Sequence, residues 1–169
     1  IKLTIMKNYI LITLFAFLIY SCETTPPVVE EGPAPGYLVS TDGKIDARDA
    51  DPANLAIWEK YIDAHNNRDY ETIMTMNHDS IVLNLADGRN IMGTDDHMVA
   101  LKEYMSVANP NWDIYFSYTM HVEGQNGDWV ITGHRVKETV DGEESNPWII
   151  TDTFIVDGKI RRIIGFEKK

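Results

Sequence analysis

The chain has 169 residues, of which 44% are hydrophobic and 10% aromatic, and its formal net charge is -11 at pH 7. This composition predicts a folded protein with one core and excludes a wholly disordered chain. The negative charge repels phosphate backbones, and the nearest approach to a basic stripe, Lys159, Arg161 and Arg162, is too small to overcome it, so nucleic acid is excluded as a partner.

Residues 1–21 have the order of features that an export signal requires. Lys7 precedes an apolar run over residues 9–20. This run is well short of the roughly 20 apolar residues that span a bilayer as a helix, so we expect a cleaved signal peptide and not a permanent transmembrane segment. Met6 is the expected start of translation, with residues 1–5 upstream of it.

Cys22 is the single cysteine of the chain and directly follows the apolar run, so it cannot form an internal disulfide. The segment Leu18-Ile19-Tyr20-Ser21-Cys22 resembles the cleavage site of bacterial lipoprotein signals, although the bulky Tyr20 departs from that pattern. The resemblance implies cleavage before Cys22 and lipid on its thiol, which would anchor the protein to a membrane of the cell envelope, outside the cytoplasm. The alternative is an incidental cysteine after an ordinary signal.

Residues 22–51 are predicted to form a tether. They hold four of the seven prolines, together with glycines and an acidic pair. Proline favours an extended chain of about 3.1 Å per residue, so the tether could reach on the order of 90 Å. The expected organisation is therefore a signal peptide over 1–21, a lipid-anchored linker over 22–51 and one domain over 52–169.

The domain is predicted to contain three helices, over residues 52–66, 69–76 and 94–108. Asp51, Asp69 and Thr94 are suitable residues to begin them, because each side chain can accept a hydrogen bond from a free backbone N–H. In the first helix Leu55, Trp58, Ile62 and His65 recur at helical spacing, which indicates a wide buried face.

The remaining segments are predicted to be strands. They are residues 81–85, a short partner ending at Met92, and four long strands over 112–123, 129–140, 148–156 and 159–167. Asn-Gly and Asp-Gly pairs lie between the long strands and favour hairpin turns. Alternation over 112–123 predicts one apolar face, made of Trp112, Ile114, Phe116, Tyr118, Met120 and Val122. The fold class is therefore α+β.

The order and spacing of these elements resemble the cone-shaped NTF2-like fold and, within it, the SnoaL-like, polyketide cyclase-like group. The likeness covers about residues 52–168. The residues that carry it are Trp58, Ala64, Asp69, Asp79, Gly88, Gly93, Gly127-Asp128 and Asp157-Gly158-Lys159-Ile160. It implies a curved antiparallel sheet packed on three helices around a ligand-sized cavity, and frequent homodimers. Known members are isomerases, cyclases, dehydratases or simple binders, and fold alone does not choose among them.

Asp152 is the first candidate for catalysis. It has the strand parity of Trp148, Ile150, Phe154 and Val156, so its carboxylate is expected to lie among apolar side chains. Partial desolvation would raise its pKa and suit it to proton transfer. The resemblance implies an acidic residue on a late strand in related enzymes. The alternatives are an aspartate at a wet sheet end or one paired with Arg135.

His134 is the second candidate, because its neighbours of equal parity form a mixed face that could line a cavity; a hydrogen-bonded structural histidine is the alternative. The other histidines show no metal-ligand spacing, so no metal is expected. The sequence contains no serine nucleophile elbow, phosphate-binding loop or cysteine nucleophile, and no cofactor is expected.

Aromatic and sulfur-containing residues are expected to form the wall of the cavity, although such residues are also typical of a core. They are Trp58, Tyr61, Met105, Phe116, Tyr118 and Trp148. The favoured function is a membrane-tethered module that binds a small apolar or amphipathic molecule, or pairs with a protein partner. The alternative is a cofactor-free lyase, isomerase or cyclase that uses Asp152 as general acid or base, with His134 as a second group.

Overall fold

The computed structural model describes residues 32–168. The chain divides into two units, Ile1–Pro33 and Ala34–Lys169, and the helices and strands described here belong to the second. The expected signal peptide, the lipidation site Cys22 and the first part of the expected tether lie outside the described residues. Within residues 32–168, no helix is both long enough and apolar enough to cross a bilayer.

The described residues form three helices, α2 (Ala53–Asn66), α3 (Tyr70–Met76) and α4 (Thr94–Ala108). All three agree closely with the sequence prediction. At the start of α3, the Asp69 carboxylate accepts a hydrogen bond from the Thr72 backbone N–H at 3.0 Å, as expected for a capping aspartate. Thr94 differs from the prediction, because it is the first helical residue and Gly93, at a φ of 87°, holds the capping position.

The strands of the described residues belong to one curved sheet. They are β1 (Gly36–Ser40), β2 (Gly43–Arg48), β3 (Asn77–Asn84), β4 (Asn90–Met92), β5 (Asn111–Val122), β6 (Asp128–Val140), β7 (Glu143–Ser145), β8 (Trp148–Val156) and β9 (Lys159–Glu167). The spatial order is β1-β2-β5-β6-β8-β9-β3-β4, with β7 paired to β6. Only the pairing of β3 with β9 is parallel among these strands.

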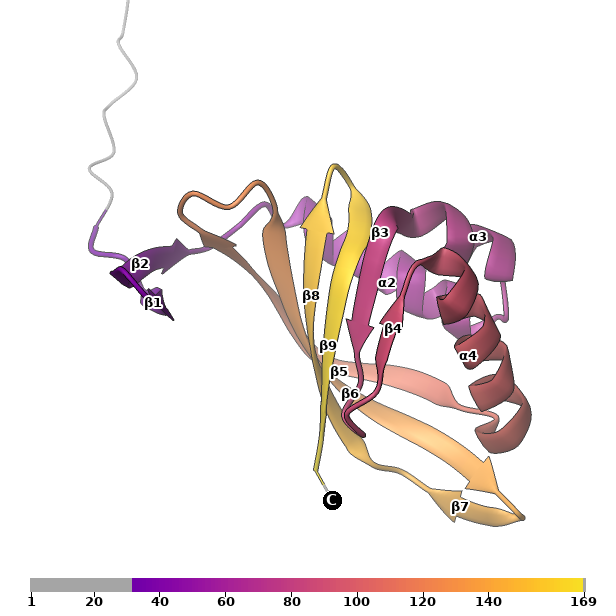
Figure 1. The fold of residues 1–169 in the computed structure, drawn as a ribbon. Coiled ribbons are helices and arrows are strands. Elements are labelled where there is room, and N and C mark those ends of the chain that lie inside the picture. The colour runs from indigo at the N-terminus through magenta and orange to yellow at the C-terminus, as the bar shows by residue number, and fades with distance from the viewer. Residues whose placement is uncertain (1–31, 169) are drawn as a thin grey trace, which may run out of the picture. The chain divides into compact units, whose positions relative to one another are not determined.

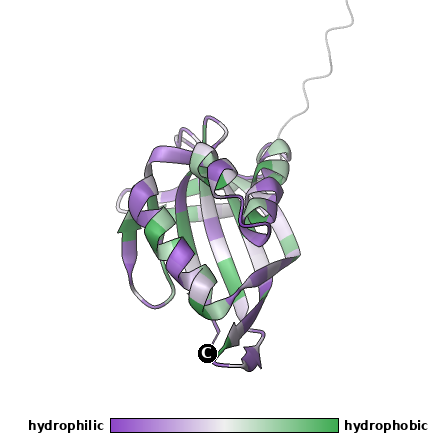
Figure 2. Ribbon diagram, turned by 90° about the vertical axis from the view of Figure 1, so that its right-hand side faces the viewer, coloured by the Kyte–Doolittle hydropathy of each residue, from purple (hydrophilic) through white to green (hydrophobic). Residues whose placement is uncertain are grey.

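The helices cover one face of the sheet, called here the inner face, and leave the outer face bare (Figure 1). Green and purple segments alternate along the helices and strands in Figure 2, as expected of elements with one buried side. The core lies between the inner face and the helices, where Trp58 and Tyr61 of α2 pack with Ile81 of β3 and Ile160 of β9. The expected α+β class, with a curved sheet packed on three helices, is confirmed.

A β-bulge in β5 changes which side chains share a face. Ile114 pairs with His134 and Phe116 pairs with Gly133, so Tyr115 is an extra residue between them. A bulge of this kind moves all following side chains to the opposite face. The predicted single apolar face over residues 112–123 is therefore wrong: Trp112 and Ile114 face inward, whereas Phe116 and Tyr118 face outward.

Part of the predicted tether is folded. Residues 36–48 form a hairpin of β1 and β2, in which Ser40 pairs with Gly43, and Ala47 of β2 continues the sheet by pairing with Val122 of β5. Gly43 has a φ of 123°, which a residue with a side chain rarely adopts. The folded unit thus begins before residue 52, the boundary that the sequence suggested.

Arg68 connects the ends of the two long helices. Its guanidinium donates to the carbonyl oxygens of His65 and Asn66 at the end of α2, both at 3.1 Å. It also donates to Asn109 Oδ1 at 2.8 Å and to the Pro110 carbonyl at 2.9 Å, just beyond α4. These charge-assisted bonds fix α2 relative to α4 and so fix one side of the space between them.

Candidate ligand pocket

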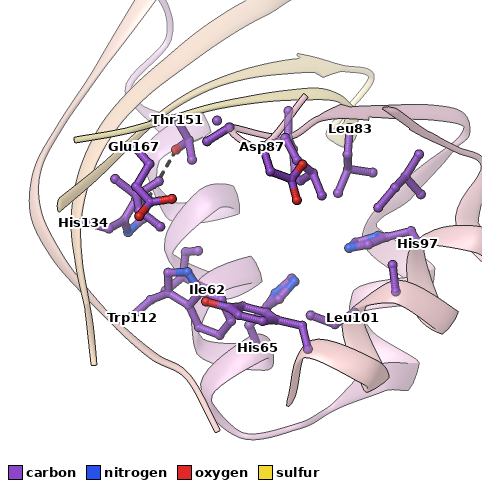
Figure 3. Close-up of a pocket in the computed structure, with 18 of the residues that line it drawn as sticks. Ile62, His65, Leu83, Asp87, His97, Leu101, Trp112, His134, Thr151 and Glu167 are labelled. Carbon is purple, nitrogen blue, oxygen red and sulfur yellow. Dashed lines mark hydrogen bonds between the residues drawn. The ribbon is translucent and has the colours of Figure 1, made fainter. Parts of the chain in front are cut away.

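A pocket of about 310 Å³ lies between the inner face of the sheet and helices α2 and α4. This volume is at the lower end of the range of small-molecule sites, about 300–1,000 Å³. Apolar side chains supply most of its wall, and they come from both helices and from five strands. They include Ile62, Leu83, Ile91, Leu101, Trp112, Ile149 and Ile163. Figure 3 shows these elements enclosing a central space into which several polar side chains point.

A chain of buried hydrogen bonds holds one of those polar side chains, His97. The Tyr61 hydroxyl donates to Asn77 Oδ1 at 2.7 Å, and Asn77 Nδ2 lies 3.1 Å from His97 Nδ1. Tyr61 is 1% exposed, Asn77 2% and His97 4%. The network therefore orients the His97 ring from behind, and Figure 3 shows the ring directed into the pocket.

His65 lines the same pocket from α2. Its Nδ1 lies 2.7 Å from the backbone carbonyl of Tyr61, one turn earlier in the helix. Its ring is 7% exposed and stacks near His97, with the ring centroids 6.1 Å apart. The two histidines thus come from different helices and present neighbouring imidazoles to one cavity.

The histidines of the pocket are neutral at physiological pH. Burial lowers the pKa of His65 to about 4 and that of His97 to about 3, in the second case with a further effect of the nearby His65. Burial also lowers the pKa of His134 to about 4. A low-dielectric site disfavours the imidazolium form, so these rings act as hydrogen-bonding groups and not as fixed charges.

His134, the second sequence candidate, does line the pocket. Its Nε2 lies 3.3 Å from the Thr151 hydroxyl oxygen (Figure 3), and its ring contacts Trp58 edge-on, with centroids 5.8 Å apart. Its Nδ1 and the Trp58 indole N–H are buried without a hydrogen-bond partner among the described residues. The expectation that His134 faces a cavity is therefore met, whereas its catalytic role stays a prediction.

The more exposed end of the pocket carries most of its charge. The Tyr104 hydroxyl donates a short hydrogen bond to Glu138, and burial, together with that carboxylate, raises the pKa of Tyr104. Asp87 is paired with Arg89 at 2.6 Å. Glu167 also lines this end. Among the described residues, the pocket lining therefore holds three carboxylates and one guanidinium.

The structure corrects the expected placement of Asp152. Thr151 lines the pocket, and Asp152, as its neighbour on β8, points to the outer face. Asp152 does share a strand face with Trp148, Ile150, Phe154 and Val156, as predicted, and burial raises the pKa of its carboxyl group as expected. Those apolar neighbours, however, belong to the outer face. Strand parity cannot say which of two faces encloses a cavity, so a catalytic role for Asp152 has no support from the pocket.

Only some of the residues expected to form the aromatic wall of the cavity line the pocket. Trp58 and Tyr61 line the pocket. Met105 instead packs in the core cluster, and Trp148 lies on the outer face, where Arg135 stacks on its ring at 4.1 Å. Phe116 and Tyr118 are on the outer face because of the bulge in β5, and they are 41% and 52% exposed.

Sequence reasoning missed the role of His65 and His97. His65 was assigned to the buried face of its helix, which is correct, but nothing in the sequence pairs it with a histidine 32 positions later. The pairing arises because α4 crosses the same face of the sheet as α2. Within residues 32–168, no group of three or more metal-ligating side chains is positioned to hold a metal ion.

Solved structures with an NTF2-like fold are similar to this chain. A protein described as a SnoaL-like polyketide cyclase, from Jannaschia sp. CCS1, is 12% identical, with 72% of this chain and 91% of that chain covered and a TM-score of 0.59. The LEH-like epoxide hydrolase of M. tuberculosis is 15% identical, with 68% of this chain and 82% of that chain covered and a TM-score of 0.57. A protein described as a ketosteroid isomerase, from Kribbella flavida, is 20% identical, with 69% of this chain and 78% of that chain covered and a TM-score of 0.53.

No protein-family model matches the sequence, and no curated protein matches it. At identities of 20% or less, the similar structures establish the fold and leave the chemistry open. The fold is therefore NTF2-like, as the order of elements in the sequence suggested.

Proposed function

We propose that the inner pocket binds a small, uncharged and largely apolar molecule. The observation that carries the proposal is the pocket itself, which combines an apolar wall with three buried neutral histidines. Apolar walls with a few oriented polar groups are typical of small-molecule sites. Solved structures of similar fold are named as enzymes that act on small organic molecules, which agrees with a ligand of this kind.

Binding is favoured over proton-transfer catalysis for two reasons. A histidine whose pKa is about 3 or 4 is a weak general base at neutral pH, and Asp152, the carboxylate first expected to act, faces away from the pocket. The alternative is a cofactor-free isomerase, lyase or cyclase. It would have to use the carboxylates at the exposed end, Glu138 or Glu167, as the proton acceptor.

The binding proposal predicts that filling the pocket abolishes binding of an uncharged fluorescent probe, N-phenyl-1-naphthylamine. Gly165 lines the pocket, and a Cβ there would meet only ordinary contacts, the nearest at 3.7 Å. We expect Gly165→Phe to fold and to weaken probe binding at least about tenfold in a fluorescence titration. Ile164→Phe places the same side chain one position away, on the outer face, and should leave binding unchanged. Equal affinity of wild type and Gly165→Phe would contradict the proposal.

We also propose that the folded unit is held at a membrane by lipid on Cys22. The support is the sequence alone: an apolar run too short to span a bilayer, followed directly by the single cysteine. A pocket for apolar molecules close to a lipid surface would be well placed to receive a ligand that partitions into the bilayer.

A homodimer through the outer face is proposed as well. Two adjacent rows of paired residues cross β5, β6, β8 and β9 on that face. They are Phe116-Gly133-Ile150-Phe166 and Tyr118-Ile131-Asp152-Ile164, and four of these large side chains are 41–52% exposed. Arg162 lies on the same face, two positions from Ile164. Two-fold pairing would bury this apolar surface and bring Asp152 of one copy near Arg162 of the second.

The dimer proposal predicts that Ile150→Asp, in the middle of the outer face, converts a dimer into a monomer. An added carboxylate beside Asp152 would have to be buried without a partner in the interface, which is strongly unfavourable. Sedimentation velocity of the purified protein measures the effect. Val99→Asp, at a residue of α4 that is 68% exposed, is the control and should leave the dimer intact. A wild-type protein that sediments as a monomer at all concentrations would contradict the proposal.

A further inference from the structure

His65 and His97 have opposite hydrogen-bonding roles in the pocket, and the buried network determines which is which. The starting point is Tyr61, whose hydroxyl is buried and has only Asn77 Oδ1 as a hydrogen-bond acceptor among the described residues. If the Asn77 amide were turned over, the hydroxyl proton would face an NH₂ group and lose its acceptor, which is unfavourable in a buried site. The amide oxygen therefore faces Tyr61 and the amide nitrogen faces His97.

The protonation of His97 follows from this orientation. An amide nitrogen only donates, so His97 Nδ1 must accept, 3.1 Å away. A neutral imidazole that accepts at Nδ1 carries its proton on Nε2. His97 Nε2–H has no acceptor among the described residues, so it is a hydrogen-bond donor offered to the pocket.

His65 has the opposite form. The atom facing its Nδ1, at 2.7 Å, is the backbone carbonyl oxygen of Tyr61, which only accepts. Nδ1 of His65 must therefore carry the proton. In the neutral ring this leaves a lone pair on Nε2, which has no donor among the described residues. His65 thus offers the pocket an acceptor beside the donor of His97.

The charges around the pocket oppose an anionic ligand. Asp87, Glu138 and Glu167 line it, and the one guanidinium that lines it among residues 32–168, that of Arg89, is already paired with Asp87. The neutral histidines add no positive charge. A carboxylate or phosphate ligand would therefore lose its hydration in a negative site without gaining a cation.

We infer that the pocket recognises an uncharged group that both donates and accepts a hydrogen bond, such as an alcohol hydroxyl on an apolar molecule. The hydroxyl donates to His65 Nε2 and accepts from His97 Nε2–H, while the rest of the molecule lies against the apolar wall. The ring centroids are 6.1 Å apart, which leaves room for one group to contact both rings. This inference rests on the proposed binding function and adds the chemical class of the ligand to it.

The competition test uses two isomers and an acid. 1-Octanol and 1-methoxyheptane have the same atoms, but only the alcohol can donate, and octanoate adds a negative charge. We expect 1-octanol to displace bound N-phenyl-1-naphthylamine at about tenfold lower concentration than the ether, since one hydrogen bond is worth about that factor, and octanoate to compete least. His65→Phe removes the acceptor that only the alcohol can use and should erase the preference for the alcohol, whereas Val99→Phe, on the exposed side of α4, should keep it.

Nitrogen-15 NMR of the wild-type protein tests the same inference and does not depend on whether a substituted protein folds. The expected spectra show His97 protonated on Nε2 and His65 protonated on Nδ1. Equal competition by alcohol and ether, or a His97 ring protonated on Nδ1, would overturn the inference while leaving the binding proposal intact. Failure of wild-type protein to bind the probe at all would overturn both.

Discussion

Lowering the pH from 7.5 to 5 is expected to destabilise the folded protein by on the order of 5 kcal/mol. The cause is the set of buried histidines, His65, His97 and His134, whose pKa values lie at about 4, 3 and 4 in the folded state, against about 6.5 in an unfolded chain. The unfolded state therefore binds protons first as the pH falls. The stability is complete above pH 6.5 and is lost progressively from there down to about pH 4 for His65 and His134 and to about pH 3 for His97.

The size of this effect follows from proton linkage. Each histidine contributes about 1.4 kcal/mol per pH unit inside that window, or about 2 kcal/mol between pH 7.5 and 5. Asp152 acts in the opposite direction, because its raised pKa makes its charged form unfavourable and protonation relieves that cost. A loss on the order of 5 kcal/mol would consume much of the 5–15 kcal/mol that stabilises a typical domain.

Urea unfolding at pH 7.5, 6 and 5 measures this prediction. His97→Gln removes one of the three titrating rings and should reduce the pH dependence of the unfolding free energy by about a third. Val99→Gln, on an exposed part of the same helix, should leave the pH dependence unchanged. A free energy of unfolding that is flat between pH 7.5 and 5 would show that the three rings are not buried in their neutral forms.

Cys22→Ala is expected to move the protein from the membrane fraction to the soluble fraction. Each acyl methylene buried in a bilayer contributes about 0.8 kcal/mol, so the acyl chains on one residue hold a protein firmly, and their loss removes the whole anchor. The effect should be nearly all-or-none. Cell fractionation with detection of the protein in each fraction measures it.

Ser21→Ala is the matched control for the anchor. It keeps a small residue before the expected cleavage point and leaves the thiol in place, so this variant should remain with the membrane. Incorporation of a labelled fatty acid into wild type and Ser21→Ala, but not into Cys22→Ala, would tie the result to lipid. Membrane retention of Cys22→Ala would contradict lipidation.

Local sequence signals predicted the helices and most strands. The carboxylate of Asp69 and the hairpin turns act within a few residues, so their effect can be read from the chain. Asp157-Gly158 shows this well: both residues adopt positive φ, at 50° and 72°, as a tight two-residue turn requires. The bulge at Tyr115 could not be predicted from the sequence, because the alternation of apolar and polar residues is the same with or without an extra residue in the strand.

The site was less predictable than the fold, for a reason that Asp152 illustrates. Its apolar neighbours and its raised pKa were foreseen, but both faces of the central strands carry apolar residues, so parity alone could not identify the inner face. The hydrogen bond that defines the role of His97 depends on Asn77, which joins β3 to both long helices. Such contacts arise only once the sheet order is known.

A crystal structure of the protein with N-phenyl-1-naphthylamine would test the central proposal most directly. Ligand density between α2, α4 and strands β8 and β9, beside His65 and His97, is the result that the pocket predicts. Density confined to the outer sheet face, or an inner pocket closed by its own side chains in crystals that contain the probe, would contradict a binding function for this cavity.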